Sequence, residues 1–146
     1  MAKRLTDDEV ELLRFKAKEA FGKSQCTYSK FGVGCAIMLN DNRCICGFNI
    51  ENSAYSVTIC AERVAMVSAI SQYGVTSKDI KAIGIYLESP LVGSPCGVCR
   101  QFLYEKCPKE TPVFMFNGSG PEVESTVEEL LPYGFGKDNL ICKQDL

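Results

Sequence analysis

The chain has 146 residues, of which 46% are apolar and 23% charged, a composition typical of one globular domain with a core of ordinary size. Its 16 basic and 18 acidic residues give a net charge of −2, so it lacks the basic excess that nucleic-acid-binding proteins use. No apolar run approaches the ~20 residues that span a bilayer, and no signal peptide is visible. We therefore expect a single domain over residues 1–146 of a cytoplasmic protein that acts on neither nucleic acid nor membranes.

The first half of the chain is predicted to form one helix and a hairpin. Thr6 and Glu9 have the spacing of a capping box, and the helix that they open ends at Gly22. Its apolar stripe consists of Val10, Leu13, Phe15, Ala17 and Phe21. A loop over 26–32 leads to an apolar strand over 33–39, and a turn at 40–42 returns the chain as a second strand over 43–48. Residues 49–56 are polar and irregular.

The second half alternates helices with strands. A helix with a small-residue face is predicted over 59–73, followed by a strand over 80–87, a helix over 96–106 and a strand over 112–116. After a turn at 117–120, a short strand begins at Val123, and a second capping box of Thr126 and Glu129 opens a helix that Pro132 closes. Strands that alternate with helices, with one hairpin early in the chain, predict an α/β sandwich of helices around a mixed sheet.

The chain contains nine cysteines and no histidine, which restricts its chemistry. Without histidine, Ser-His-Asp hydrolases, histidine-ligated zinc sites and histidine general bases are excluded. In a reducing cytosol, a Cys-x-x-Cys pair is more often metal-binding or redox-active than a structural disulfide. Six cysteines are interpreted as small apolar fillers, namely Cys26, Cys35, Cys44, Cys46, Cys107 and Cys142. Cys44 and Cys46 share one face of a strand, so a second metal site there is the alternative.

The other three cysteines stand at the starts of predicted helices, in two short motifs. These motifs are Thr58-Ile59-Cys60-Ala61-Glu62-Arg63 and Ser94-Pro95-Cys96-Gly97-Val98-Cys99-Arg100-Gln101. Three thiolates can hold a zinc ion and leave its fourth tetrahedral position open to water. Helix N-termini lower the pKa of thiols, because backbone N–H groups and the helix dipole favour the anion. The pattern predicts a hydrolytic zinc site with Cys60, Cys96 and Cys99 as ligands.

Charged residues beside these ligands complete the predicted site. Glu62 is the predicted proton shuttle between the zinc-bound water, the substrate and the leaving group. Because a zinc ion with three thiolates is anionic, we expect the pKa of Glu62 to be raised. Arg63 and Arg100 each follow a ligand in the sequence, and we expect both to hydrogen-bond to sulfur and to offset this negative charge.

Other interpretations of the motifs stay open. Cys96 and Cys99 could be the redox pair of a thiol oxidoreductase, or a purely structural zinc could take a fourth ligand from the six remaining cysteines. Glu62 could be a solvated helix residue. The corresponding alternative functions are a thiol oxidoreductase and a non-catalytic zinc-binding interaction module.

Beyond the metal motifs, the chain resembles the small homotetrameric cytidine deaminases of the three-cysteine zinc type. Cys60-Ala61-Glu62-Arg63 is followed by Pro95-Cys96-Gly97-Val98-Cys99-Arg100-Gln101, which begins 35 residues after Cys60. Further matches in the family's order and spacing are Tyr28-Ser29-Lys30-Phe31, Val33-Gly34, Asn49-Ile50-Glu51-Asn52, Ala54-Tyr55-Ser56, Leu130-Leu131-Pro132 and Phe135-Gly136. The resemblance covers nearly the whole chain. Its departures, at Thr27, Cys35, Val64 and Val98, flank the chemistry.

This resemblance implies a three-layer α-β-α sandwich with a mixed five-stranded sheet, one zinc ion per subunit, and a homotetramer whose sites are completed by neighbouring subunits. It implies deamination of cytidine and 2'-deoxycytidine to uridine and 2'-deoxyuridine plus ammonia, in pyrimidine salvage. In that reaction zinc-bound hydroxide attacks C4 of the base while Glu62 shuttles protons. A related deaminase that acts on blasticidin or on a polynucleotide is the alternative.

The resemblance also assigns substrate-binding residues. Asn49 and Glu51 would hold the ribose, and Phe31 would pack on the base. Backbone groups at Ala61 and a carbonyl near Ser94 or Pro95 would bind the polar edge of the base. Tyr55 would lie near a subunit boundary, and Phe135 would reach the site of a neighbouring subunit. From the residues alone, Phe31 and Phe135 would be interpreted as core residues, and Asn49 and Glu51 as turn residues.

Overall fold

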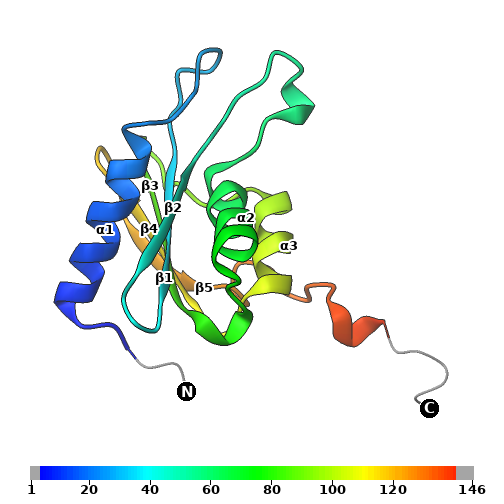
Figure 1. Ribbon diagram of the computed structural model, residues 1–146. Coiled ribbons are helices and arrows are strands. Elements are labelled where there is room, and N and C mark those ends of the chain that lie inside the picture. The colour runs from blue at the N-terminus through cyan, green and yellow to red at the C-terminus, as the bar shows by residue number, and fades with distance from the viewer. Residues whose placement is uncertain (1–3, 141–146) are drawn as a thin grey trace.

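The computed structural model describes residues 4–140 and is built on a mixed five-stranded sheet (Figure 1). The strands are β1 (Gly34–Leu39), β2 (Cys44–Phe48), β3 (Ile80–Leu87), β4 (Pro112–Asn117) and β5 (Val123–Thr126). They lie in the order β2-β1-β3-β4-β5, with β3 and β4 parallel and every other pair antiparallel. The predicted mixed sheet is therefore confirmed, and each predicted strand is present.

Helices cover both faces of this sheet, which confirms the three-layer sandwich. Helix α1 (Asp7–Phe21) lies on one face, and α2 (Ala61–Tyr73) and α3 (Gly97–Lys106) lie side by side on the other (Figure 1). Two apolar clusters fill the two interfaces, one centred on Leu13 and Met38 under α1, the other on Ile37, Ile85 and Leu103 under α2 and α3. Within residues 4–140, no helix has the length and apolar character needed to cross a membrane.

Helix α1 begins at the predicted capping box. The Glu9 N–H donates to Thr6 Oγ1 at 3.2 Å, and the Thr6 N–H donates to Glu9 Oε2 at 2.9 Å. Leu13 and Ala17 are buried as the predicted stripe requires, but the prediction for Phe15 was wrong, since 60% of this residue is exposed. Residues two positions apart on a helix point in nearly opposite directions, so Phe15 cannot share a face with Leu13.

Helix α2 lies unusually close to strand β2, and Gly47 makes this approach possible. A Cβ atom at Gly47 would lie 2.4 Å from the Ala65 N and 2.9 Å from the Ala61 O. Ala61, Ala65 and Ala69, spaced four residues apart along the helix, are small and fully buried. The close packing fixes the position of the helix N-terminus, where the first predicted metal ligand stands.

The helix predicted after β5 is reduced to a single turn. The predicted capping hydrogen bonds form, since the Glu129 N–H donates to Thr126 Oγ1 at 3.2 Å and the Leu130 N–H donates to the Thr126 carbonyl at 3.1 Å. Residues 127–130 nevertheless form a turn rather than a helix. Pro132 lacks a backbone N–H and follows too soon for a second turn to be added, and a lone helical turn is intrinsically unfavourable.

Gly47→Ala should destabilise the fold by about 1–3 kcal/mol, because a methyl group there would overlap the backbone of α2. Urea unfolding followed by circular dichroism measures this loss. Gly22→Ala is the matched control, since its Cβ would meet nothing closer than the Glu19 carbonyl at 3.5 Å, and the free energy of unfolding should change by no more than about 1 kcal/mol. Equal stabilities of the two variants would contradict the close approach.

Candidate zinc site

The three predicted ligands meet where α2 and α3 begin. Cys60 and Cys96 are the residues immediately before these two helices, and Cys99 lies in the first turn of α3. Their Sγ atoms all lie within 4.8 Å of one another, with 3.9 Å between Cys60 and Cys96. A tetrahedral zinc ion with Zn–S bonds of ~2.3 Å needs sulfurs about 3.8 Å apart. The spacing of the sulfurs therefore fits a zinc ion.

The donor set leaves one corner of a zinc tetrahedron free of protein ligands. Among the described residues, these cysteines are the one group of three or more Cys, Asp or Glu side chains close enough to share a metal ion. The alternative second site at Cys44 and Cys46 is therefore not formed within residues 4–140, and no fourth ligand joins the group there. Cys142, interpreted above as an apolar filler, lies outside the described residues.

Arg63 supplies positive charge to the sulfurs. Its Nη2 donates to Cys60 Sγ at 3.5 Å, as predicted, while its Nε is buried without a partner. Hydrogen bonds from Cys99 and Arg63 lower the pKa of Cys60 to about 5, and the hydrogen bond to Cys60 together with burial raises the pKa of Cys99. These hydrogen bonds favour the thiolate form of Cys60, which is the form that binds a metal ion.

Glu62 is buried beside the ligands. Only 5% of this residue is exposed, and Cys99 Sγ donates to its Oε2 at 3.7 Å. The alternative that Glu62 is a solvated helix residue is therefore excluded. The pKa of Glu62 is raised, as expected, but the main cause is burial, and the charge of Cys60 adds to it.

Arg100 does not contact sulfur, so that prediction was wrong. Its Nε donates to the Pro95 carbonyl at 2.7 Å, its Nη1 donates to the Leu130 carbonyl at 2.9 Å, and its Nη2 donates to Ser94 Oγ. Neighbouring residues on a helix point in directions about 100° apart, so a residue that follows Cys99 directly is turned away from the metal position. Arg100 instead braces the segment before Cys96 against the turn that contains Leu130.

A short ladder of backbone pairs brings residues 49–51 beside the first ligand. The Ile50 N–H donates to the Ile59 carbonyl at 3.0 Å, and the Ile59 N–H returns the bond at the same distance. On its other side Ile50 is bridged to Gln25. Asn49 and Glu51 therefore flank a segment that is paired with the residue directly before Cys60.

Glu51 is held in place by the loop over 26–32. Its Oε1 accepts hydrogen bonds from the N–H groups of Tyr28 and Ser29, both at 3.0 Å. The side-chain hydrogen bond of Ser29, followed by the backbone hydrogen bonds of Ser29 and Tyr28, keeps the pKa of Glu51 below its ordinary value, so the side chain is ionised at neutral pH. The Tyr28 ring packs edge-on against Tyr55, with 6.0 Å between ring centroids. Tyr55 itself is 74% exposed.

Asn49 has a structural role that the sequence analysis missed. Its Oδ1 accepts from the Val33 N–H at 2.9 Å, and its Nδ2 donates to the Phe31 carbonyl at 2.9 Å. The buried amide thus holds the segment that presents Phe31, whose ring is exposed and is not the core residue that its type alone suggests. A primary amide still keeps one N–H and one lone pair for a ligand.

Phe135 is separated from this group within the chain. It is 56% exposed, and its carbonyl accepts from Gln101 Nε2 at 2.8 Å. With Val98, Phe102 and Leu140 it lines a cavity of about 750 Å³ along α3, to which Phe31, Asn49 and Glu51 do not contribute. The core interpretation of Phe135 was therefore wrong as well. Ala61, by contrast, is buried as the first residue of α2.

Comparisons with known proteins point to one family. The sequence model described as "Cytidine and deoxycytidylate deaminase zinc-binding region" matches residues 8–115. A cytidine deaminase of Sporosarcina psychrophila is 44% identical over 132 residues, which cover 90% of this chain and 95% of that protein. A cytidine deaminase of Halalkalibacterium halodurans is 38% identical over 130 residues, which cover 89% of this chain and 96% of that protein. The crystal structure of cytidine deaminase from Burkholderia pseudomallei superimposes with a TM-score of 0.81 at 34% identity, covering 90% of this chain and all of that one.

Arg63→Gln should weaken zinc binding about tenfold, because a neutral side chain no longer offsets the charge of the thiolates. Competition with a chromophoric chelator measures the dissociation constant. Arg43→Gln is the matched control, since Arg43 pairs with Asp41 on the exposed β1–β2 turn and should leave zinc affinity unchanged. Indistinguishable zinc affinities for the wild type and Arg63→Gln would refute the role of Arg63.

Proposed function

The chain belongs to the cytidine and deoxycytidylate deaminase family, and we propose that it forms one domain over residues 1–146 that hydrolyses cytidine and 2'-deoxycytidine to uridine and 2'-deoxyuridine plus ammonia, in pyrimidine salvage. The observation that carries this proposal is the meeting of Cys60, Cys96 and Cys99 with the buried carboxyl of Glu62. A zinc ion held by the three sulfurs would activate a water molecule as the nucleophile for C4 of the base.

Glu62 would move the protons of this reaction. Its raised pKa brings acid and base forms closer to balance near neutral pH, which suits a group that must both accept and donate. It takes a proton from the attacking water and passes it to the ring nitrogen of the base. Glu62 then takes the remaining proton of the added hydroxyl and passes it to the amino group, so that the C4–N bond breaks, a carbonyl forms at C4 and ammonia leaves. Because Glu62 is buried, few solvent molecules compete for these protons.

Residues on both sides of the ligands would hold the nucleoside. Glu51 is ionised and accepts two backbone bonds through Oε1, so its other oxygen can accept from a ribose hydroxyl. Asn49 has one spare N–H for the same sugar. We assign these contacts to the side of the ribose away from the 2'-hydroxyl, so deoxycytidine should also be a substrate. Phe31 offers an exposed ring to the base.

The polar edge of the base would meet backbone groups at the two helix starts. The Ala61 N–H belongs to the first turn of α2, where N–H groups have no partner within the helix. The Pro95 carbonyl already accepts from Arg100, so the Ser94 carbonyl is the better acceptor for the amino group of the base. These assignments give the site its preference for cytosine over uracil, which lacks that amino group.

We also propose a homotetramer in which neighbouring subunits complete the sites. Two features support this assembly. Tyr55 and Phe135, large apolar residues assigned to substrate binding or its boundary, are mostly exposed in the single chain, and Phe135 borders the apolar cavity along α3. If a neighbouring subunit packed against this face, Phe135 would lie close to the zinc site of that neighbour.

A reducing, cytoplasmic location fits the ligand chemistry. Every cysteine among the described residues is free, and the three ligands must stay reduced to bind zinc. Oxidising conditions would favour a disulfide between neighbouring thiols over the metal.

A direct assay tests the proposed function. Purified protein with one zinc ion per chain should release ammonia from cytidine and deoxycytidine, and far less from free cytosine, because cytosine lacks the sugar that Asn49 and Glu51 are proposed to bind. Zinc-loaded protein that releases ammonia from blasticidin S alone, or from none of these compounds, would overturn the proposal in favour of a different deaminase or of a zinc-binding module.

Glu62→Gln should lower kcat for cytidine by at least ~10²-fold, since an amide cannot transfer the protons. The variant should keep its zinc, because Glu62 is not among the ligands. Steady-state kinetics and metal analysis on the same sample give both quantities. Glu19→Gln on the exposed side of α1 is the control and should leave kcat unchanged. Near-normal turnover by zinc-loaded Glu62→Gln would contradict the role of Glu62.

A further inference from the structure

The segment that delivers Cys96 has no regular structure of its own. Residues 88–96 connect the end of β3 to α3 and belong to neither a strand nor a helix. Pro90 and Pro95 remove two backbone N–H groups that could have tied the segment down. Arg100 holds its far end, through Ser94 and Pro95. Some other group must hold its near end if Cys96 is to reach the other two sulfurs reproducibly.

Asn117, the last residue of β4, holds that near end. Its Oδ1 accepts from the Ser89 N–H at 3.1 Å, and its Nδ2 donates to the carbonyls of Ser89 at 2.8 Å and Leu91 at 2.9 Å. Oδ1 also accepts from the Ser119 N–H at 3.0 Å. The side chain is buried, with 7% of the residue exposed. One amide therefore joins the 88–96 segment to the turn that follows β4.

Only an amide can make this set of contacts. Two backbone N–H groups point at one end of the side chain and three carbonyls, those of Ser89, Leu91 and Pro121, lie at the other, so both an acceptor and a double donor are required. An aspartate of the same shape would keep the acceptor but would face the carbonyls of Ser89 and Leu91 with a second oxygen. Buried acceptors left opposite one another cost more than the missing bonds alone.

The backbone of the turn that follows Asn117 packs tightly against the 88–96 segment. A Cβ atom at Gly120 would lie 2.3 Å from the Ser89 carbonyl and 3.1 Å from the Pro90 carbonyl carbon. The turn after β4 and the start of the 88–96 segment are thus in backbone contact, which only glycine permits at this position. The amide bonds of Asn117 cross this contact.

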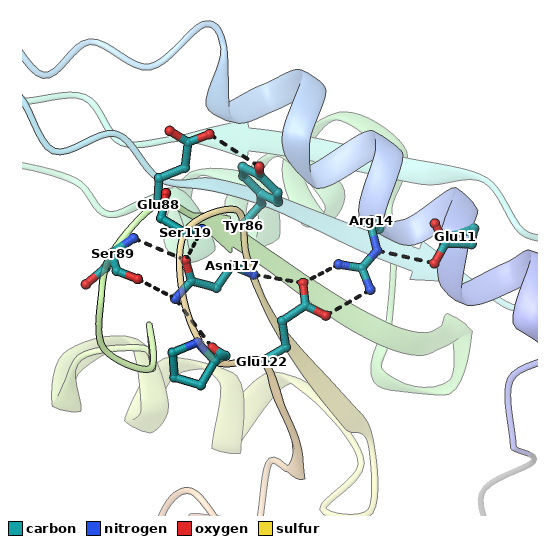
Figure 2. A network of polar contacts seen from close by, with 9 residues as sticks. Glu11, Arg14, Tyr86, Glu88, Ser89, Asn117, Ser119 and Glu122 are labelled. Carbon is teal, nitrogen blue, oxygen red and sulfur yellow. Dashed lines mark hydrogen bonds and ion pairs between the residues drawn. The ribbon is translucent and has the colours of Figure 1, made fainter.

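Asn117 is itself connected to helix α1 through Glu122 and Arg14 (Figure 2). Its backbone N–H donates to Glu122 Oε1 at 3.1 Å, and Glu122 accepts two hydrogen bonds from Arg14 of α1, one of them 2.9 Å long. Arg14 also lies over the Phe116 ring, 4.4 Å from its centroid. The pair with Arg14 lowers the pKa of Glu122, which keeps this anchor charged.

We propose that Asn117 is a positioning residue for the zinc site. By fixing residues 89–91 just beyond the end of the neighbouring strand β3, it places Cys96 at the metal position and the Ser94 carbonyl beside the substrate. The inference rests on the proposed function for its substrate half, whereas its metal half concerns the three cysteines alone. Asn117 touches neither sulfur nor substrate and acts only through the 88–96 segment.

Asn117→Asp provides the test. With the isosteric carboxylate, the zinc dissociation constant should rise about tenfold, the order expected from losing buried hydrogen bonds, and KM for cytidine should rise while kcat of the zinc-saturated enzyme changes little. Chelator competition gives the first quantity and steady-state kinetics at saturating zinc the others. Hydrogen exchange followed by mass spectrometry should show faster exchange confined to peptides that contain residues 88–95.

The controls separate positioning from a general loss of stability. Asn40→Asp makes the same chemical change on the β1–β2 turn, where Asn40 Nδ2 donates to the Lys78 carbonyl at 2.8 Å, and zinc affinity and KM should stay at the wild-type values. If Asn117→Asp does not fold, Glu122→Gln weakens the anchor more gently and should show the same changes to a smaller degree. Wild-type zinc affinity, KM and exchange in a folded Asn117 or Glu122 variant would overturn the inference.

The two proposals fail in different ways. If the wild type does not deaminate cytidine, the proposed function is lost, but the zinc and exchange measurements still decide the role of Asn117. If the wild type is active and Asn117→Asp matches it in every measurement, only the positioning role is refuted.

Discussion

The convergence of two helix N-termini on one point is the constraint from which the rest of the site follows. Cys60 and Cys96 each stand just before a helix, so the positive ends of α2 and α3 both face the sulfurs. Without histidine, the chain must bind its metal through anions alone, and the helix ends together with Arg63 balance that charge. Gly47 lets α2 approach the sheet, and the connection from β3 through α3 to β4 provides the second helix N-terminus.

The two loops that approach the sulfurs are each held by an asparagine. Asn49 bonds to the Phe31 carbonyl and the Val33 N–H, and Asn117 bonds to the backbone of Ser89 and Leu91. In both places the chain leaves regular structure and must still reach a defined position. A buried primary amide suits this task, since it satisfies donors and acceptors together without adding a charge that the nearby metal would feel.

The fold and the ligands could be predicted from the sequence because they depend on local patterns. Capping residues such as Thr6 determine where helices begin. The Cys-x-x-Cys spacing places two sulfurs about one helical turn apart, whatever packs around them. The predictions were wrong where contacts between residues remote in sequence determine the local conformation. Arg100 bonds to the carbonyl of Leu130, which is remote in sequence, and the turn after Thr126 is too short to become a helix. The sequence marks Asn117 only as a turn residue, because its partners follow the end of the neighbouring strand β3.

Because the side chain of Asn49 hydrogen-bonds to two separate backbone groups, a variant at this position changes more than one part of the site. Any replacement that removes its amide also frees the Phe31 carbonyl and the Val33 N–H inside the protein. Loss of the proposed contact with the sugar and displacement of the Phe31 ring would then arise from the same substitution. Loss of activity at this position would report the sum of two disturbances, so the strength of the proposed contact between Asn49 and the sugar must be measured with nucleosides altered at the hydroxyl, with the protein left intact.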